Sequence, residues 1–120
     1  MAIATLSTVV LDCPDPDALG RFYQQLVGGE LKREEHDWTH LTLPSGTDLA
    51  FQAAPGFVPP NWPAPDDSQQ FHLDLSVPDL DAAEQQVLAL GARVLDAGDP
   101  SRSWRVYADP VGHPFCLCKD

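Results

Sequence analysis

The side chains best suited to chemistry in this chain are histidines, acidic residues and cysteines that lie close together in short apolar segments. His72 and Asp74 are two residues apart, so they would share one face of a strand. Cys116 and Cys118 have the same spacing near the C-terminus. An imidazole beside a carboxylate suits ligand binding or acid–base chemistry, and thiols near an imidazole suit a soft metal or a nucleophilic mechanism.

Each of these residues also has a purely structural interpretation. His72 fits equally well as a polar residue satisfied by its neighbours, and both readings stay open. A Cys-x-Cys pair on a strand lacks the usual turn spacing of a zinc site, and free cysteines are often buried, so core thiols are favoured for Cys116 and Cys118. His113 follows Gly112, where turn hydrogen bonds explain a histidine better than chemistry does.

Aromatic residues form a second group of candidates. Trp38 and His40 alternate onto one strand face, and Trp104 occupies the matching place in a later strand. If this face lines a cavity, which we favour, the tryptophans form an aromatic clamp; if it faces the helices, they belong to the core. Trp62 lies in a proline-rich run and is a candidate to cover the cavity mouth or a subunit contact.

The elements that would position these residues occur twice. Residues 8–18 and 72–82 both read as a strand followed by Pro-Asp-x-Asp-Ala and an apolar helical stripe. A second match supports the repeat, because Trp38, Pro44 and Gly46 recur 66 residues later as Trp104, Pro110 and Gly112. Two copies of this length indicate a duplicated β-α-β-β-β module. The expected boundaries are module 1 at about 1–54, a linker at about 55–69 and module 2 at about 70–120, within one domain. The expected strands cover 5–12, 30–35, 38–43, 48–53, 71–77, 93–96, 104–108 and 114–119, and the helices end at Gly28 and Gly91.

Composition excludes several classes of function. A net charge of −11 argues against nucleic acid, whose phosphates require clustered basic residues. The sequence contains no run of about 20 apolar residues that would span a membrane. Three cysteines, an odd number, without a secretion signal indicate a cytoplasmic protein with free thiols.

Several motifs together resemble the vicinal oxygen chelate superfamily, which includes glyoxalase I, extradiol dioxygenases, fosfomycin resistance enzymes and bleomycin-binding proteins. They are Pro-Asp-Leu-Asp-Ala-Ala at 78–83, Pro-x-Trp-Pro at 60–63, Gln-x-His-Leu-Asp-Leu at 70–75 and Gly-His-Pro-Phe-Cys-Leu at 112–117. The resemblance spans nearly the whole chain and is closest to small glyoxalase-like bacterial proteins. It implies an α+β fold in which two paired βαβββ modules form a cup-shaped mixed sheet with the helices outside. The inward strand faces would then line a ligand cavity.

The resemblance also implies where a metal would bind. Family metal enzymes place ligands on the first strand of each half, usually His or Gln, and on the last strand of each half, usually Glu. These positions fall on Thr8 and His72, on Cys116, and on Ala50 or Gln52. Only His72 is a conventional ligand there, so we predict that the usual metal centre is lost and that the protein needs no cofactor.

These observations lead to three functional hypotheses. The first is a metal-independent protein that binds a small, partly aromatic and cationic molecule. Its candidate ligand-binding residues are Thr8, Trp38, His40, Gln52, Trp62, Asp74, Trp104 and Cys116, with His72 as the candidate catalytic residue. The alternative is a lyase, isomerase or dioxygenase that acts on a vicinal-oxygen substrate through a divalent metal held by His72, Gln52 and Cys116. The third is a structural or regulatory partner protein, and a homodimer is expected from the resemblance.

Overall fold

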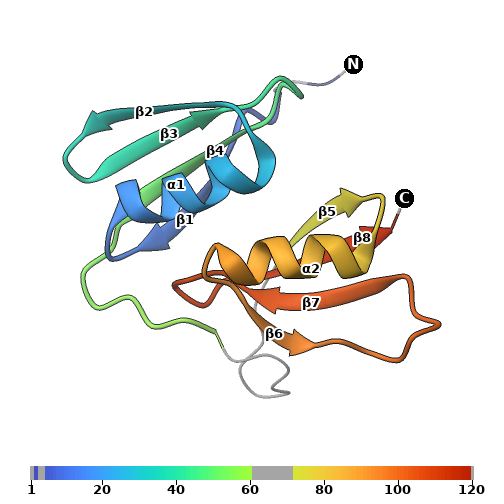
Figure 1. Ribbon diagram of the computed structural model, residues 1–120. Coiled ribbons are helices and arrows are strands. Elements are labelled where there is room, and N and C mark those ends of the chain that lie inside the picture. Colours follow the sequence, from blue (N-terminus) through green and yellow to red (C-terminus); the bar gives the residue numbers. More distant parts are fainter. Residues whose placement is uncertain (1, 3–4, 61–71, 120) are drawn as a thin grey trace. The chain divides into compact units, whose positions relative to one another are not determined.

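The chain folds into two units of the same design. The computed structural model describes residues 2, 5–60 and 72–119, and the chain divides into Met1–Phe57 and Val58–Asp120. Each unit is a four-stranded mixed sheet with one helix across one face (Figure 1). The predicted α+β fold of two βαβββ modules is therefore confirmed.

Unit 1 contains β1 (Thr8–Cys13), α1 (Pro16–Val27), β2 (Glu30–Glu35), β3 (Trp38–Thr42) and β4 (Asp48–Ala53). The strand order is β1-β4-β3-β2, and only the β1–β4 pair is parallel. The helix starts as its sequence predicts: Asp15 is the N-cap, its carboxylate accepts the Ala18 N–H at 3.3 Å, and Pro16 takes the first helical position.

Unit 2 repeats this plan with β5 (Leu73–Val77), α2 (Leu80–Ala89), β6 (Arg93–Asp96), β7 (Trp104–Ala108) and β8 (Pro114–Lys119). The order is β5-β8-β7-β6, again with the first and last strands parallel. Asp79 caps α2 in the same way, since it accepts the Ala82 N–H at 3.2 Å.

Strand register confirms the duplication residue by residue. In unit 1, Ala50 on β4 lies opposite Val10 on β1 and His40 on β3. In unit 2, Cys116 on β8 lies opposite Asp74 and Val106. Because the two three-residue rows occupy the same places in their sheets, Ala50 is the counterpart of Cys116.

The helix-facing side of each sheet forms the core. In unit 1 the ring of Tyr23 on α1 stacks on Phe51, with centroids 5.6 Å apart. In unit 2 Tyr107 on β7 donates a hydrogen bond to Glu84 on α2 at 2.7 Å. Because side chains alternate along a strand, Trp104, three residues before Tyr107, lies on the opposite face. The tryptophan-bearing face of unit 1 also points away from the helix, since Thr39, next to Trp38, bonds to Asp17 of α1.

Three strands differ from prediction at their ends. The first strand ends at Cys13 and not at residue 12, and the fifth begins at Leu73 and not at residue 71. The first strand begins at Thr8 and not at residue 5, because its partner β4 begins at Asp48, which pairs with Thr8. The third strand ends at Thr42 and not at residue 43, because the Leu43 N–H donates to the Asp48 carboxylate at 3.0 Å and joins the turn. Residue 71 and residues 61–69 of the predicted linker lie outside the described residues.

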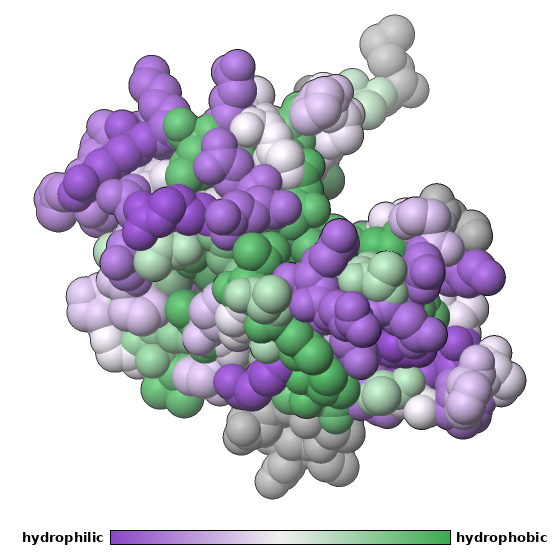
Figure 2. Space-filling view, in the orientation of Figure 1, coloured by the Kyte–Doolittle hydropathy of each residue, from purple (hydrophilic) through white to green (hydrophobic). Residues whose placement is uncertain are grey.

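The surface carries the acidic character of the chain. Five of the six β2 residues are exposed, and all five are charged, three acidic and two basic. Figure 2 shows hydrophilic residues, in purple, over the β2–β3 hairpin and over α2. Within the described part of the chain, the helices are too short or too polar to cross a bilayer.

The turn between β7 and β8 is held by one buried carboxylate. Asp109 is fully buried, and its Oδ1 accepts the backbone N–H groups of Val111, Gly112 and His113 at 2.9–3.0 Å. Gly112 has φ +105°, and a Cβ there would lie 2.3 Å from Pro59, so only glycine fits. The predicted turn role of the Gly112–His113 pair is thus seen in the backbone.

We expect Asp109→Ala to destabilise the protein by about 2–4 kcal/mol, because three buried N–H donors lose a charged acceptor. Asp109→Asn, which keeps one acceptor oxygen, should cost less. Urea unfolding followed by circular dichroism measures the difference, with the exposed Glu30→Ala as the control expected within about 0.5 kcal/mol of wild type. An Asp109→Ala variant as stable as that control would contradict this account.

Candidate functional site

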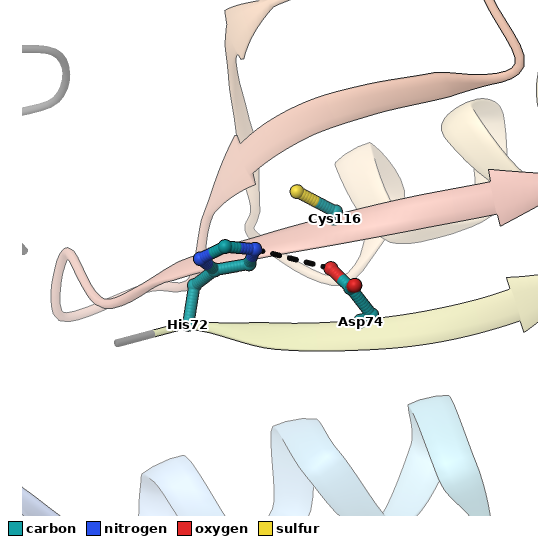
Figure 3. A group of neighbouring side chains, drawn as sticks. All are labelled: His72, Asp74 and Cys116. Atoms are coloured by element: carbon teal, nitrogen blue, oxygen red, sulfur yellow. Dashed lines mark ion pairs between the residues drawn. The ribbon is translucent and has the colours of Figure 1, made fainter. Parts of the chain in front are cut away.

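Three donor atoms of different chemistry meet at one end of unit 2. The imidazole of His72, a carboxylate oxygen of Asp74 and the thiol of Cys116 lie within 4.8 Å of one another. His72 Nε2 is 3.1 Å from Asp74 Oδ1, forming an ion pair when the imidazole is protonated. Figure 3 shows the His72 and Asp74 side chains turned toward one another, with Cys116 on the neighbouring strand.

The parallel pairing of β5 with β8 creates this cluster. His72 immediately precedes β5, and Asp74 lies directly opposite Cys116 in the register. Residues more than 40 positions apart in the sequence are therefore neighbours. Both strands turn their even-numbered residues away from α2, so the three side chains stand on the open face of the sheet.

A cavity of about 290 Å³ adjoins the cluster, lined by His72, Asp74, Trp104, Cys116 and Cys118. Trp104 is 39% exposed, and the guanidinium carbon of Arg102 lies 3.8 Å from the centroid of its ring. An aromatic wall with a few polar groups at one end is typical of small-molecule sites, although this volume is near the lower limit for them.

The two thiols of the cavity are held in their neutral form. Burial, followed by the negative charge of Asp74 nearby, raises the pKa of the Cys116 thiol to about 12. The same two causes raise the pKa of Cys118. A thiol is nucleophilic as the thiolate, so the structure gives Cys116 no activation at neutral pH.

The candidates in unit 1 do not form such a cluster. Thr8 pairs with Asp48 in the sheet, and its hydroxyl is 3.4 Å from that of Ser7. His40 lies between two acidic side chains, with Nε2 3.0 Å from Asp48 and Nδ1 3.4 Å from Glu34. The hydrogen bond from His40, with the Leu43 N–H, lowers the pKa of Asp48. His40 is thus part of a charged network between strands.

Trp38 and Gln52 line a separate cavity of about 320 Å³ in unit 1, together with Glu34, Glu35 and Asp37. They are direct partners in the β3–β4 register. Trp62 lies outside the described residues.

Sequence reasoning missed two features of the cavity. Arg102 was not identified as important, although an arginine two residues before a tryptophan at a strand start is a signal for stacking. Asp74 was expected to bind a ligand beside His72, but its proximity to the Cys116 thiol depends on the strand register, which alternation alone does not provide.

Comparison with known proteins assigns the family. The model of the glyoxalase-like domain matches residues 8–118. The chain belongs to this glyoxalase-like family. No curated protein matched it.

Solved structures agree with the assignment and show the same fold. A glyoxalase/bleomycin resistance protein/dioxygenase family enzyme from Burkholderia phytofirmans is 19% identical, with 97% of this chain and 98% of that chain covered and a TM-score of 0.76. A fosfomycin resistance protein from Listeria monocytogenes is 14% identical, with 99% and 95% covered and a TM-score of 0.73. A glyoxalase-related enzyme from Fulvimarina pelagi is 17% identical, with 98% and 89% covered and a TM-score of 0.71. The fold is that of the vicinal oxygen chelate superfamily.

The donors of this glyoxalase-like chain do not fit the family's expected metal set. Register makes Ala50, which has no donor atom, the counterpart of Cys116, while Gln52 corresponds to Cys118. Thr8 is a weak donor. The nitrogen, oxygen and sulfur atoms of the unit 2 cluster instead suit a borderline or soft ion such as Zn²⁺ or Co²⁺.

We expect Cys116 to react slowly with a thiol reagent at pH 7.5 and to speed up about tenfold per pH unit up to pH 10, because the thiolate fraction follows its high pKa. The measurement uses Cys13→Ser/Cys118→Ser protein, so that one thiol remains. Adding Asp74→Asn should accelerate the reaction at every pH, since it removes a charge that opposes ionisation, and Glu30→Gln should not. A rate that levels off near pH 8.5 would show an ordinary thiol and refute the assignment.

Proposed function

We propose that this glyoxalase-like protein binds a small planar molecule in the unit 2 cavity, without requiring the divalent-metal centre of its metal-dependent relatives. The observation that supports the proposal best is the cavity itself, in which the Trp104 ring and the His72–Asp74 pair line one space of about 290 Å³. Trp104 offers apolar contact area, and the pair offers hydrogen-bonding groups that orient a ligand.

The polar groups define what such a ligand would carry. The Asp74 carboxylate is 66% exposed in its side chain and accepts hydrogen bonds, so it favours a hydroxyl or amide N–H donor. The His72 imidazole lines the same cavity beside this carboxylate and adds a second polar group to its wall. A planar ring with a hydrogen-bond donor at its edge, such as a phenol, matches both the aromatic and the polar wall.

Trp104→Ala is expected to weaken binding of the probe 3-tert-butylphenol at least tenfold, because the phenol ring loses the indole surface that it contacts. Titration followed by amide shifts in ¹H–¹⁵N spectra would measure the affinity and place the probe near Cys116 and Cys118. Trp38→Ala, which removes the tryptophan of the other cavity, is the matched control and should leave the affinity unchanged. Equal affinities in wild type and Trp104→Ala would disprove the proposed site.

A second function is favoured by one specific observation, the convergence of His72, Asp74 and Cys116 within 4.8 Å. We propose as the alternative that these three side chains hold a borderline metal ion, with lyase, isomerase or dioxygenase activity on a vicinal-oxygen substrate. When bound, such an ion would act as a Lewis acid on a substrate oxygen. In this alternative Asp74 takes the place predicted for Gln52, and the ligands then come from unit 2 alone.

Co²⁺ titration tests the alternative, since thiolate-bound Co²⁺ has a near-ultraviolet charge-transfer band. The band should appear in wild type, disappear in Cys116→Ser, and need at least tenfold more Co²⁺ in His72→Ala. Cys13→Ser, which removes the buried thiol of unit 1, should behave as wild type. A band that persists in Cys116→Ser would place the ion elsewhere and overturn the alternative.

The homodimer and the cytoplasmic location remain predictions from the resemblance and from the cysteine content. The role of a structural or regulatory partner protein likewise remains a prediction.

A further inference from the structure

Arg102 stacks on Trp104, the tryptophan that lines the unit 2 cavity, but does not itself line that cavity. We propose that Arg102 is a specificity-determining residue: its guanidinium, placed on one face of the Trp104 indole, makes the cavity select uncharged planar ligands over organic cations. The inference rests on the proposed small-molecule function and names the ligand class of that same site.

The guanidinium is fixed from several directions. Its Nε donates to the Trp104 carbonyl at 2.9 Å, and its two terminal nitrogens contact Asp96, one at the carboxylate (3.3 Å) and one at the carbonyl (3.1 Å). The Arg102 side chain is only 23% exposed, which is low for an arginine. Such a set of contacts holds the planar group in one orientation.

The preceding loop is shaped to admit this group. Gly98 has φ +65°, and a Cβ at that position would lie 2.3 Å from the Arg102 guanidinium carbon. The Gly98 N–H is held by the Asp96 carboxylate at 3.0 Å, so the loop backbone closes over the guanidinium. A side chain at residue 98 would displace the arginine from its place, which indicates that the arrangement depends on this glycine.

Because Arg102 stacks on the Trp104 indole, a ligand can contact only part of that ring. The guanidinium carbon lies 3.8 Å from the ring centroid, so that face is covered. Among the described residues, the cavity lining includes Trp104 and not Arg102. A ligand in the cavity therefore meets the other face or the edge of the ring.

The positive charge of Arg102 changes which ligands bind favourably to the exposed part of the Trp104 ring. An indole attracts cations through the negative potential over its face, and this interaction is already used by Arg102. A second cation stacked on the ring would also be repelled by the first at close range. The acidic chain favoured a cationic ligand, and Asp74 places a carboxylate in the cavity. The indole face on which a cation would stack is nevertheless occupied by Arg102, so an uncharged ring is the better match for the remaining surface of Trp104.

The first test needs no ligand. In Trp38→Phe/Trp62→Phe protein, Trp104 is the only fluorescent tryptophan, and iodide and caesium ions at equal ionic strength report the charge around it. We expect iodide to quench more strongly than caesium, and Arg102→Gln to lower the iodide-to-caesium ratio at least about twofold. Arg93→Gln removes the same charge from an exposed site of unit 2 and should not change the ratio. An unchanged ratio in folded Arg102→Gln protein would overturn the proposal.

The second test measures selectivity with two probes of equal shape, 3-tert-butylphenol and 3-hydroxyphenyltrimethylammonium. Wild type should prefer the uncharged probe, and Arg102→Gln should reduce that preference about two- to fivefold. If Arg102→Gln does not fold, wild type alone decides, because equal or tighter binding of the cation contradicts the proposal. If neither probe binds, the proposed function fails and the selectivity with it, whereas the quenching ratio still shows whether Arg102 sets the charge at Trp104.

Discussion

The parallel pairing of the first and last strand of unit 2 is the constraint on which the candidate site depends. It places Asp74 opposite Cys116, although the two residues belong to opposite ends of the module. A shift of one residue would turn either side chain onto the helix-facing side, where α2 packs. The register is fixed by that buried face, since Phe115 and Leu117 are fully buried on the strand that carries Cys116.

Burial gives this site a chemistry that differs from that of an exposed Cys–His–Asp group. The Cys116 thiol is desolvated and lies near a carboxylate, and both effects oppose ionisation. The same environment bears on both proposed functions: a neutral thiol would contribute apolar surface to a binding cavity, whereas a divalent ion would supply the positive charge that a thiolate needs. The two proposed functions therefore differ in one physical quantity, the source of positive charge beside the sulfur.

Much of the fold could be predicted from the sequence because its signals are local. Helix caps at Asp15 and Asp79 and the alternation along each strand gave most element boundaries correctly, and the repeat gave the duplicated modules. The candidate site was harder to predict from the sequence. Alternation predicted that His72 and Asp74 share a face, but strand order and register are needed to bring Cys116 beside them, and the stacking of Arg102 depends on a loop that has no repeating pattern.

The comparison of the two units explains why the repeat predicts architecture better than chemistry. Folding selects apolar residues on the helix-facing side of each sheet. Each unit has a stacked Tyr–Phe pair there, although the pairs occupy different places, Tyr23–Phe51 in unit 1 and Tyr107–Phe115 in unit 2. The opposite face carries no such requirement, so equivalent places hold Val10 and Ala50 in unit 1 but Asp74 and Cys116 in unit 2. A duplicated fold can thus keep its register in both copies while only unit 2 has donor atoms at this pair of places, and function must be argued from that face of each unit separately.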